Sequence, residues 1–319
     1  MKIVFLKIII LFFVLFNYSF ANQENKKLAY IVSDMSIPFW KIMSKGIKAK
    51  ADEFGYEVEF YSSNNLKKVE LLNLVNALDK KVDGLIISPI NSSSAVTLLE
   101  LAKNANIPVV ISDIGTDKGE YLSFISSDNK MGAYELGKIL SKKMIELNWH
   151  KDGTVGIISI PQKRTNGKER TSGFLEALNE ANIKSDGIYQ QVDFSYEETY
   201  NYSKKLINEK PNLRAIWLQG SDKYKGALNA IKDSKKEGEI LFICFDAEPE
   251  FLDLIPKGVL VGSAMQQPYL MGSKAVEVLN NYWNKKEVNK EYKLPILAIS
   301  KDNIQENLST IKINVLGIK

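Results

Sequence analysis

The chain has 319 residues, 45% of them hydrophobic, with 42 basic and 38 acidic side chains and a formal net charge of +4. No basic run is long enough to form a nucleic-acid-binding surface, so nucleic acid is not an expected partner. The single cysteine, Cys244, excludes an intramolecular disulfide, and its apolar surroundings indicate a buried strand.

The first 21 residues have the pattern of a secretory signal peptide. Lys2 and Lys7 flank the start of an apolar run at 8–16, which is too short to span a bilayer comfortably. Ser19 and Ala21 form a small-x-small cleavage pattern. We therefore expect residues 1–21 to be removed and the mature chain to reside in the periplasm. An uncleaved anchor is the alternative, and it also places the globular part outside the cytoplasm.

Short apolar runs rich in β-formers alternate with longer segments of helical periodicity in the first half of the chain. The predicted strands span 28–33, 57–61, 84–88 and 108–112, and the predicted helices span 39–54, 67–80 and 92–104. This repeated βαβ order predicts a parallel sheet with helices on both faces.

A second series of the same kind follows residues 126–129. Its helices are predicted at 130–147, 168–180, 196–208 and 224–233, and its strands at 154–160, 188–192, 215–219 and 241–245. The fold class is therefore α/β, with two similar doubly wound parallel-sheet lobes. Because open parallel sheets bind ligands at the carboxyl ends of their strands, the functional residues should lie there, in a cleft between the lobes.

The segments at those strand ends carry a family resemblance. They are Ser33-Asp34-Met35-Ser36-Ile37-Pro38-Phe39-Trp40, Ser88-Pro89, Asp113, Ser127-Asp128-Asn129, Gly167 to Phe174, Val192-Asp193-Phe194, Phe245-Asp246 and Met265-Gln266-Gln267-Pro268. In this order and spacing the chain resembles the ribose/galactose-type periplasmic sugar-binding proteins of the type I fold, from residue 28 to about 299. LacI-like repressors share this fold in their effector domains, but they carry a helix-turn-helix where this chain has its signal-like segment.

The resemblance implies a three-segment hinge, with crossings near 126–129, 264–268 and 292–295. The expected N-terminal lobe is 27–127 plus 267–294, and the expected C-terminal lobe is 128–266 plus 295–319. The apolar segment 311–318 is expected to add an edge strand to the second lobe.

The candidate ligand-binding residues follow from the motifs and from the chemistry of a polyol, which offers apolar C–H faces and a rim of hydroxyls. The aromatic rings expected to stack on the C–H faces are those of Phe39 and Trp40 on one lobe and Phe194 on the other. The polar and small candidates are Ser33, Asp113, Lys168, Arg170, Gly220, Asp246 and Gln266. No metal or cofactor is required.

Each candidate also has a purely structural interpretation. Phe39 and Trp40 begin a helix with core periodicity, and either could pack inward. Asp113 and Asp246 could cap the turn or helix that follows them. One of Lys168 and Arg170 is expected only to face water.

Departures from the family pattern bear on the ligand. Ile37 replaces an asparagine of the ribose binders, Ile114 an arginine, Gly220 an asparagine, and Lys168 the first arginine of an Arg-x-Arg motif. The ammonium group of Lys168 is a point charge and cannot form the paired hydrogen bonds of a planar arginine guanidinium. The pocket is therefore expected to have fewer guanidinium groups and to disfavour ribose itself; a more apolar polyol derivative or a cationic ligand held by cation–π contact is an alternative.

Catalysis is not expected. The single histidine, His150, lies in a helix-to-strand loop, and the Cys/His ligands of a zinc site are lacking. The segment 132–139 imitates a phosphate-binding loop, but Ile139 stands at the position of the metal-binding hydroxyl. No Gly-x-Gly-x-x-Gly follows the first strand.

The predicted function is that of a monomeric periplasmic solute-binding protein that closes around a small sugar-like ligand and presents it to an ABC-type permease. The alternative is a sensor of a cationic, amine or autoinducer-like ligand that signals to a membrane histidine kinase or chemoreceptor.

Overall fold

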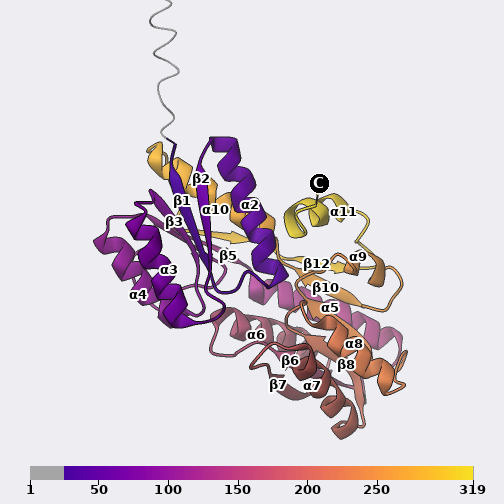
Figure 1. Cartoon of the computed structure of the whole chain (residues 1–319). Helices are drawn as coiled ribbons and strands as arrows, with labels where there is room; N and C mark the ends of the chain where they lie inside the picture. The colour runs from indigo at the N-terminus through magenta and orange to yellow at the C-terminus, as the bar shows by residue number, and fades with distance from the viewer. Residues whose placement is uncertain (1–24, 319) are drawn as a thin grey trace, which may run out of the picture.

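A computed structural model describes residues 25–318 as two α/β lobes, one above the other in Figure 1. Each lobe is built on a six-stranded sheet, which confirms the predicted fold class. The predicted signal peptide lies outside the described residues. No helix among residues 25–318 combines the length and the apolar character needed to cross a bilayer.

The sheet of the N-terminal lobe is entirely parallel, with strand order β11-β5-β4-β3-β1-β2. Its strands are β1 (Lys27–Val32), β2 (Glu57–Ser62), β3 (Gly84–Ser88), β4 (Val109–Ser112), β5 (Ser123–Ser127) and β11 (Glu291–Leu294). The central strands β1, β3 and β4 are buried almost throughout, as the continuous apolar runs predicted.

Helices cover both faces of this sheet. They are α2 (Pro38–Phe54), α3 (Lys67–Asp79), α4 (Ser92–Asn104) and α10 (Pro268–Trp283). Side chains of α2 and α10 pack with Leu28, Tyr30 and Val32 of β1, while α3 and α4 pack with Ala29 and Ile31. The alternation along β1 thus supplies one core on each side (Figure 1).

The sheet of the C-terminal lobe has the order β12-β10-β9-β8-β6-β7. Its strands are β6 (Thr154–Ser159), β7 (Lys184–Gln190), β8 (Leu213–Leu218), β9 (Leu241–Phe245), β10 (Gly262–Met265) and β12 (Leu297–Ser300). All neighbours are parallel except the edge pair β10 and β12, which is antiparallel.

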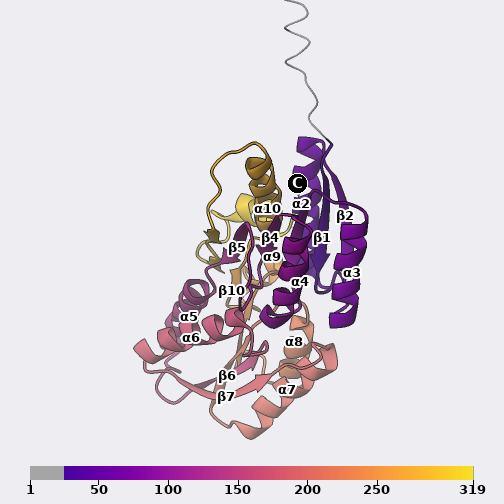
Figure 2. The ribbon, with the colours of Figure 1, turned by 90° about the vertical axis from the view of Figure 1, so that its left-hand side faces the viewer.

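Helices α5 and α6 lie on one side of this second sheet, and α7 and α8 lie on the other (Figure 2). The helices are α5 (Asn129–Glu146), α6 (Thr165–Glu180), α7 (Tyr196–Glu209) and α8 (Tyr224–Asp233), with the short α9 (Phe251–Leu254) after β9. Cys244 is buried in β9, as its apolar surroundings predicted.

The chain passes between the two sheets at three places: from β5 to α5, from β10 to α10, and from β11 to β12. Hydrogen bonds join these crossings to one another. The Asp128 N–H donates to the Leu294 carbonyl at 2.9 Å. The buried Gln267 donates from Nε2 to the Pro295 carbonyl at 2.8 Å.

The C-terminal segment differs from its prediction. The expected edge strand at 311–318 is wrong: the chain forms α11 (Leu308–Thr310) and a π-helical turn η1 (Ile311–Val315). Ile311 and Val315, one turn apart, are buried in the C-terminal lobe, while Ile313 between them is 49% exposed. Apolar residues at every second position mimicked a strand, but burial four residues apart is typical of a helix.

Candidate functional site

A central cavity of about 80 Å³ lies between the lobes. From the N-terminal lobe it is lined by Ile37, Phe39, Trp40 and Asp113. From the C-terminal lobe it is lined by Ile160, Arg164, Asn166, Arg170, Phe194, Gln219, Gly220, Asp222, Asp246 and Gln266. These residues lie at or just after the carboxyl ends of strands, where the topology of parallel sheets places binding residues.

Aromatic rings line both sides of the central cavity. Phe39 and Trp40 pack edge to face with their centroids 4.9 Å apart, at the start of α2. Trp40 is only 6% exposed and also contributes to the lobe core, so it combines the two roles that the sequence left open. Phe194 lines the cavity from the C-terminal lobe. The cavity therefore offers apolar ring surfaces from both lobes.

Three cavity residues have backbone conformations that are unusual for residues with side chains. The φ angles of Asp113, Phe194 and Asp246 are +67°, +56° and +67°. Such left-handed conformations are sterically costly outside glycine, and they concentrate at functional sites when the surrounding structure enforces them. Here each follows a strand and turns its side chain into the space between the lobes.

A buried polar network joins Arg170, Asp246 and Gln266. Gln266 Nε2 donates to Asp246 Oδ1 at 2.7 Å, and Arg170 Nη1 lies 3.6 Å from Asp246 Oδ2. Arg170 also donates to the Asn129 side chain and the Gln219 carbonyl, both at 2.8 Å. Burial raises the pKa of Asp246, while Arg170 and Gln266 act against that rise. The network fixes a carboxylate and a guanidinium at the cavity wall.

Two acceptor atoms at the cavity have no hydrogen-bond partner among the described residues. They are Asp113 Oδ1 and Gln266 Oε1, and both are buried. Burial raises the pKa of Asp113 to about 6; Arg170 and Arg164 lower it, and the charge of Asp246 raises it further. Buried acceptors are normally satisfied, so these two atoms are free to receive hydroxyl or amino donors from a bound molecule.

Arg164 was missed by the sequence analysis. It precedes α6 directly, and its Nη2 donates to the Ile90 carbonyl of the N-terminal lobe at 3.3 Å, a contact that bridges the lobes. Its guanidinium also lies 5.7 Å from the centroid of the Phe194 ring. The prediction began this helix at residue 168, three residues too late, so the loop after β6 that carries Arg164 was not considered as a strand end.

Two predicted site residues do not line the cavity. Ser33 is buried and uses its backbone N–H to bond the Ser88 carbonyl, extending the pairing of β1 with β3. Lys168 is exposed on α6. It stands two residues from both Asn166 and Arg170, which puts it on the opposite side of the helix from these two cavity residues. The other predicted residues all line the central cavity.

The residues that depart from the family pattern occupy different parts of the structure, some in the cavity and one in the core. Ile37 lines the cavity, and Gly220 leaves open space in it, since a Cβ there would meet only Asp222 at 3.9 Å. Ile114 is 3% exposed and belongs to the core of the N-terminal lobe. Arg164, which the sequence analysis did not consider, supplies a second guanidinium group to the cavity besides that of Arg170.

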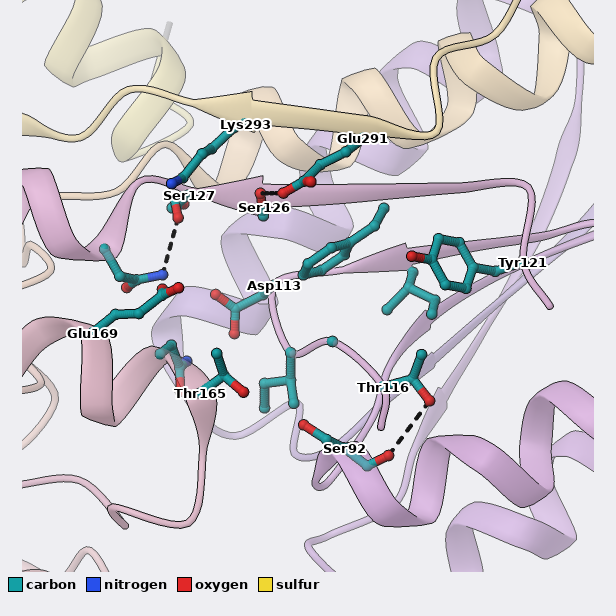
Figure 3. Close-up of a pocket in the computed structure, with 16 residues that line it drawn as sticks. Ser92, Asp113, Thr116, Tyr121, Ser126, Ser127, Thr165, Glu169, Glu291 and Lys293 are labelled. Carbon is teal, nitrogen blue, oxygen red and sulfur yellow. Dashed lines mark hydrogen bonds between the residues drawn. The ribbon is translucent and has the colours of Figure 1, made fainter. Parts of the chain in front are cut away.

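A second and larger space lies toward the hinge, and we call it the hinge-side compartment (Figure 3). Its volume is about 270 Å³. Asp113 and Asn166 line both spaces. Glu169 reaches into the compartment from α6, while Glu291 and Lys293 border it from β11.

Comparison with known proteins agrees with this architecture. The periplasmic binding protein domain family matches residues 28–287. The ribose import binding protein RbsB of Escherichia coli is 27% identical over 282 residues, which cover 86% of this chain and 90% of that protein.

Solved structures show the same fold. A periplasmic solute-binding protein of an ABC transporter from Actinobacillus succinogenes, with bound D-allose, superposes with a TM-score of 0.81 at 21% identity, covering 88% of this chain and 99% of that one. A carbohydrate transporter solute-binding protein from Agrobacterium radiobacter, in complex with D-arabinose, gives 0.83 at 19% identity, covering 92% and 100%. The chain therefore belongs to the periplasmic binding protein family, as a ribose/galactose-type protein of the type I fold.

Proposed function

We propose that this protein is a periplasmic solute-binding protein that captures a small sugar or sugar derivative in the central cavity by closure of its two lobes. The observation that carries this proposal is the pair of unpartnered acceptors, Asp113 Oδ1 and Gln266 Oε1, in a cavity with aromatic rings from both lobes. A pyranose or furanose has hydroxyl donors for those atoms and C–H faces for the rings. The named relatives, which import or bind sugars, support the same class of ligand.

Bare ribose is not the ligand we propose. At Ile37 and Gly220 the cavity lacks two polar side chains of the ribose binders, and Ile114 removes a third from its vicinity. Arg164 adds a guanidinium at a different point of the wall. A pocket that has lost some hydrogen-bonding groups and gained another should select a different pattern of hydroxyls.

The ligand is proposed to contact both lobes and hold them together. The proposed N-terminal lobe comprises residues 27–127 and 267–294, and the proposed C-terminal lobe comprises residues 128–266 and 295–319. The two lobes move as rigid bodies about the three crossings. A ligand that contacts both lobes stabilises the closed arrangement over the open one. We propose that the closed monomer delivers its ligand to an ABC-type permease, as the import function named for the relative from E. coli suggests. No catalytic step is proposed.

The test is a thermal-shift screen of the mature chain against pentoses, hexoses, polyols and amino sugars, followed by calorimetry on each compound that raises the melting temperature. We expect one ligand per chain. Asp246→Ala should abolish binding, because it removes the carboxylate that Arg170 and Gln266 hold at the cavity wall.

The matched control is Asp253→Ala, at an exposed aspartate that pairs only with Lys257 on the surface. It should bind like the unaltered protein. Circular dichroism should show that both variants are folded. Full binding by Asp246→Ala, or turnover of a glycoside without any stabilising ligand, would refute the proposed function.

A further inference from the structure

The hinge-side compartment is larger than the central cavity and is lined mostly by polar residues. Its volume of about 270 Å³ compares with about 80 Å³ for the central cavity. The two spaces meet at Asp113 and Asn166, which line both. A ligand ring in the central cavity can therefore carry a substituent past these side chains into the compartment.

The charges around this compartment are unbalanced. Asp113, Glu169 and Glu291 line it, and Lys293 is the only basic residue among the described residues that line it. The charge of Lys293 is already offset, since its Nζ lies 3.2 Å from Asp128 Oδ1. Acidic residues thus outnumber basic residues in the lining of the compartment, while the guanidinium groups of Arg164 and Arg170 act on Asp113 from outside this lining.

The carboxylates of Glu291 and Glu169 differ in their hydrogen bonding. Glu291 Oε1 accepts from the Ser126 hydroxyl at 3.1 Å. Glu169 has no hydrogen bond or ion pair through its carboxylate within residues 25–318. Burial is the main cause that raises the pKa of Glu169; Lys293 and Arg170 act against this rise, while Asp128 and Glu291 add to it. A further cation beside Glu169 would lower the pKa of its carboxyl group.

Asp113, which lines both spaces, also indicates a ligand in the compartment. Only 7% of its surface is exposed, and its Oδ1 has no hydrogen-bond partner among the described residues. Figure 3 shows its carboxylate directed into the compartment, between Glu169 and the strand β4 that precedes it. This buried and unpartnered oxygen, together with Glu169, defines a place for a hydrogen-bond donor with positive charge.

One part of the remaining wall is apolar. Ile111, Ile114, Tyr121 and Phe124 line the same space. A short hydrocarbon link between a sugar ring and an amino group would pack on these side chains, while the amino group reaches the carboxylates.

We propose that the hinge-side compartment is a subsite for a cationic amino substituent, so that the ligand of this protein is an amino-substituted sugar or aminoalkyl glycoside and not a neutral monosaccharide. Glu169 binds the ammonium group, Asp113 is shared between the ammonium group and the sugar ring because it lines both spaces, and Glu291 adds to the negative potential. This inference rests on the proposed sugar site and names the class of substrate that the site takes.

The experiment compares matched pairs of glycosides by calorimetry at low salt. The probes are the 2-aminoethyl and 2-hydroxyethyl glycosides of ribose, allose, arabinose and galactose in both anomeric forms, with the parent sugars. For at least one sugar, the aminoethyl form should bind about tenfold more tightly than the hydroxyethyl form, as expected for a charged hydrogen bond in a partly buried site. The preference should weaken as salt is added.

Glu169→Gln should reduce this preference to less than about twofold, because the amide keeps the shape of the side chain without its charge. Glu291→Gln should reduce it partly. Glu176→Gln is the control, since Glu176 lies on the same helix and pairs on the surface with Lys130. It should leave the preference unchanged.

The outcomes separate the subsite from the proposed function. Binding of parent sugars with equal or weaker binding of the aminoethyl forms would overturn the subsite and leave the sugar site standing. A preference that persists in Glu169→Gln would also overturn it. Failure of every sugar and glycoside to bind would overturn both proposals.

Discussion

At the scale of single residues, Asp113 combines three features that are each unfavourable in an ordinary protein. Its backbone is left-handed at φ +67°, its carboxyl group is buried, and one oxygen has no partner among the described residues. Conformational strain of this kind costs on the order of 1–3 kcal/mol, and an unsatisfied buried acceptor costs a similar amount. A binding site explains why the chain retains all three.

The raised pKa of Asp113 predicts a specific pH dependence of stability. A carboxyl group with a pKa of about 6 in the folded state, against an ordinary 3.8, binds its proton more tightly when folded. Its contribution to the free energy of unfolding is therefore greatest below pH 3.8 and is lost as the pH rises through 6. Asp113→Asn should gain roughly 2–3 kcal/mol relative to the unaltered protein between pH 4 and pH 7. Urea denaturation at the two pH values measures this difference.

The same substitution at Asp117, an exposed residue four positions further on, serves as the control. Asp117→Asn should follow the unaltered protein at both pH values. A constant offset between Asp113→Asn and the unaltered protein at pH 4 and pH 7 would contradict the prediction.

Most of the residues that line the central cavity could be predicted, because strand ends in a parallel sheet converge and the motifs stand there. Asp113 and Asp246 follow directly after apolar runs that are easy to recognise, and Phe194 stands in the motif Val192-Asp193-Phe194. Arg164 and Asn166 were missed for a local reason: the loop after β6 is shorter than predicted. Lys168 was included because of its charge, although its position on the helix turns it toward solvent.

At the scale of elements, glycines let two pairs of helices approach closely. A Cβ on Gly46 of α2 would lie 2.1 Å from the Tyr269 carbonyl oxygen of α10, and a Cβ on Gly272 of α10 would lie 2.2 Å from the Met43 carbonyl oxygen of α2. In the other lobe, Gly173 of α6 makes the same kind of contact with α5. These contacts hold the helices next to the crossings in fixed positions.

Gly272→Ala should destabilise the protein, because the obstructing atom is backbone and cannot move aside. Overpacking of this kind costs about 1–3 kcal/mol, which should appear as a lower midpoint of urea denaturation. Gly115→Ala is the control, since a Cβ there meets only the Phe124 ring at 3.4 Å or more. Equal midpoints for the two variants would show that α2 and α10 can separate at no cost.

The elements that the sequence did not reveal are those that neighbouring strands stabilise. β5 has three serines among its five residues and lacks an apolar run, and its pairing with β4 and β11 holds it in place. β7 was predicted at 188–192 but spans Lys184–Gln190. It is a largely exposed edge strand with an irregular register to β6, so its sequence carries little hydrophobic pattern.

At the scale of the whole molecule, the C-terminal segment connects the two lobes. Ile311, Val315 and Leu316 are buried in the C-terminal lobe. Asn314 Nδ2 donates to Gln267 Oε1 at 3.0 Å, at the start of α10, and a Cβ on Gly317 would lie 3.0 Å from the Tyr269 ring. The C-terminus accordingly lies beside α2 and α10 in both views (Figures 1 and 2).

Asn314→Ala should favour the open arrangement of the lobes, because it removes a hydrogen bond between the C-terminal segment and the second crossing. We expect a larger radius of gyration by small-angle X-ray scattering in the absence of ligand, and ligand affinity lowered by about threefold to tenfold. Asn307→Ala, whose amide bonds only within its own segment, is the control. Unchanged scattering and affinity in Asn314→Ala would refute this role.

Gln267 offers a way to change ligand affinity from outside the central cavity. One amide side chain joins the second crossing, the third crossing and the C-terminal segment, through its bonds to Pro295 and Asn314. In the proposed closure, rotation of one lobe against the other strains or exchanges these bonds, so they contribute to the free-energy difference between the ligand-free and the ligand-bound arrangement. Under the proposed function, substitutions at these positions, which lie away from the central cavity, should change the affinity for the ligand while its selectivity stays the same.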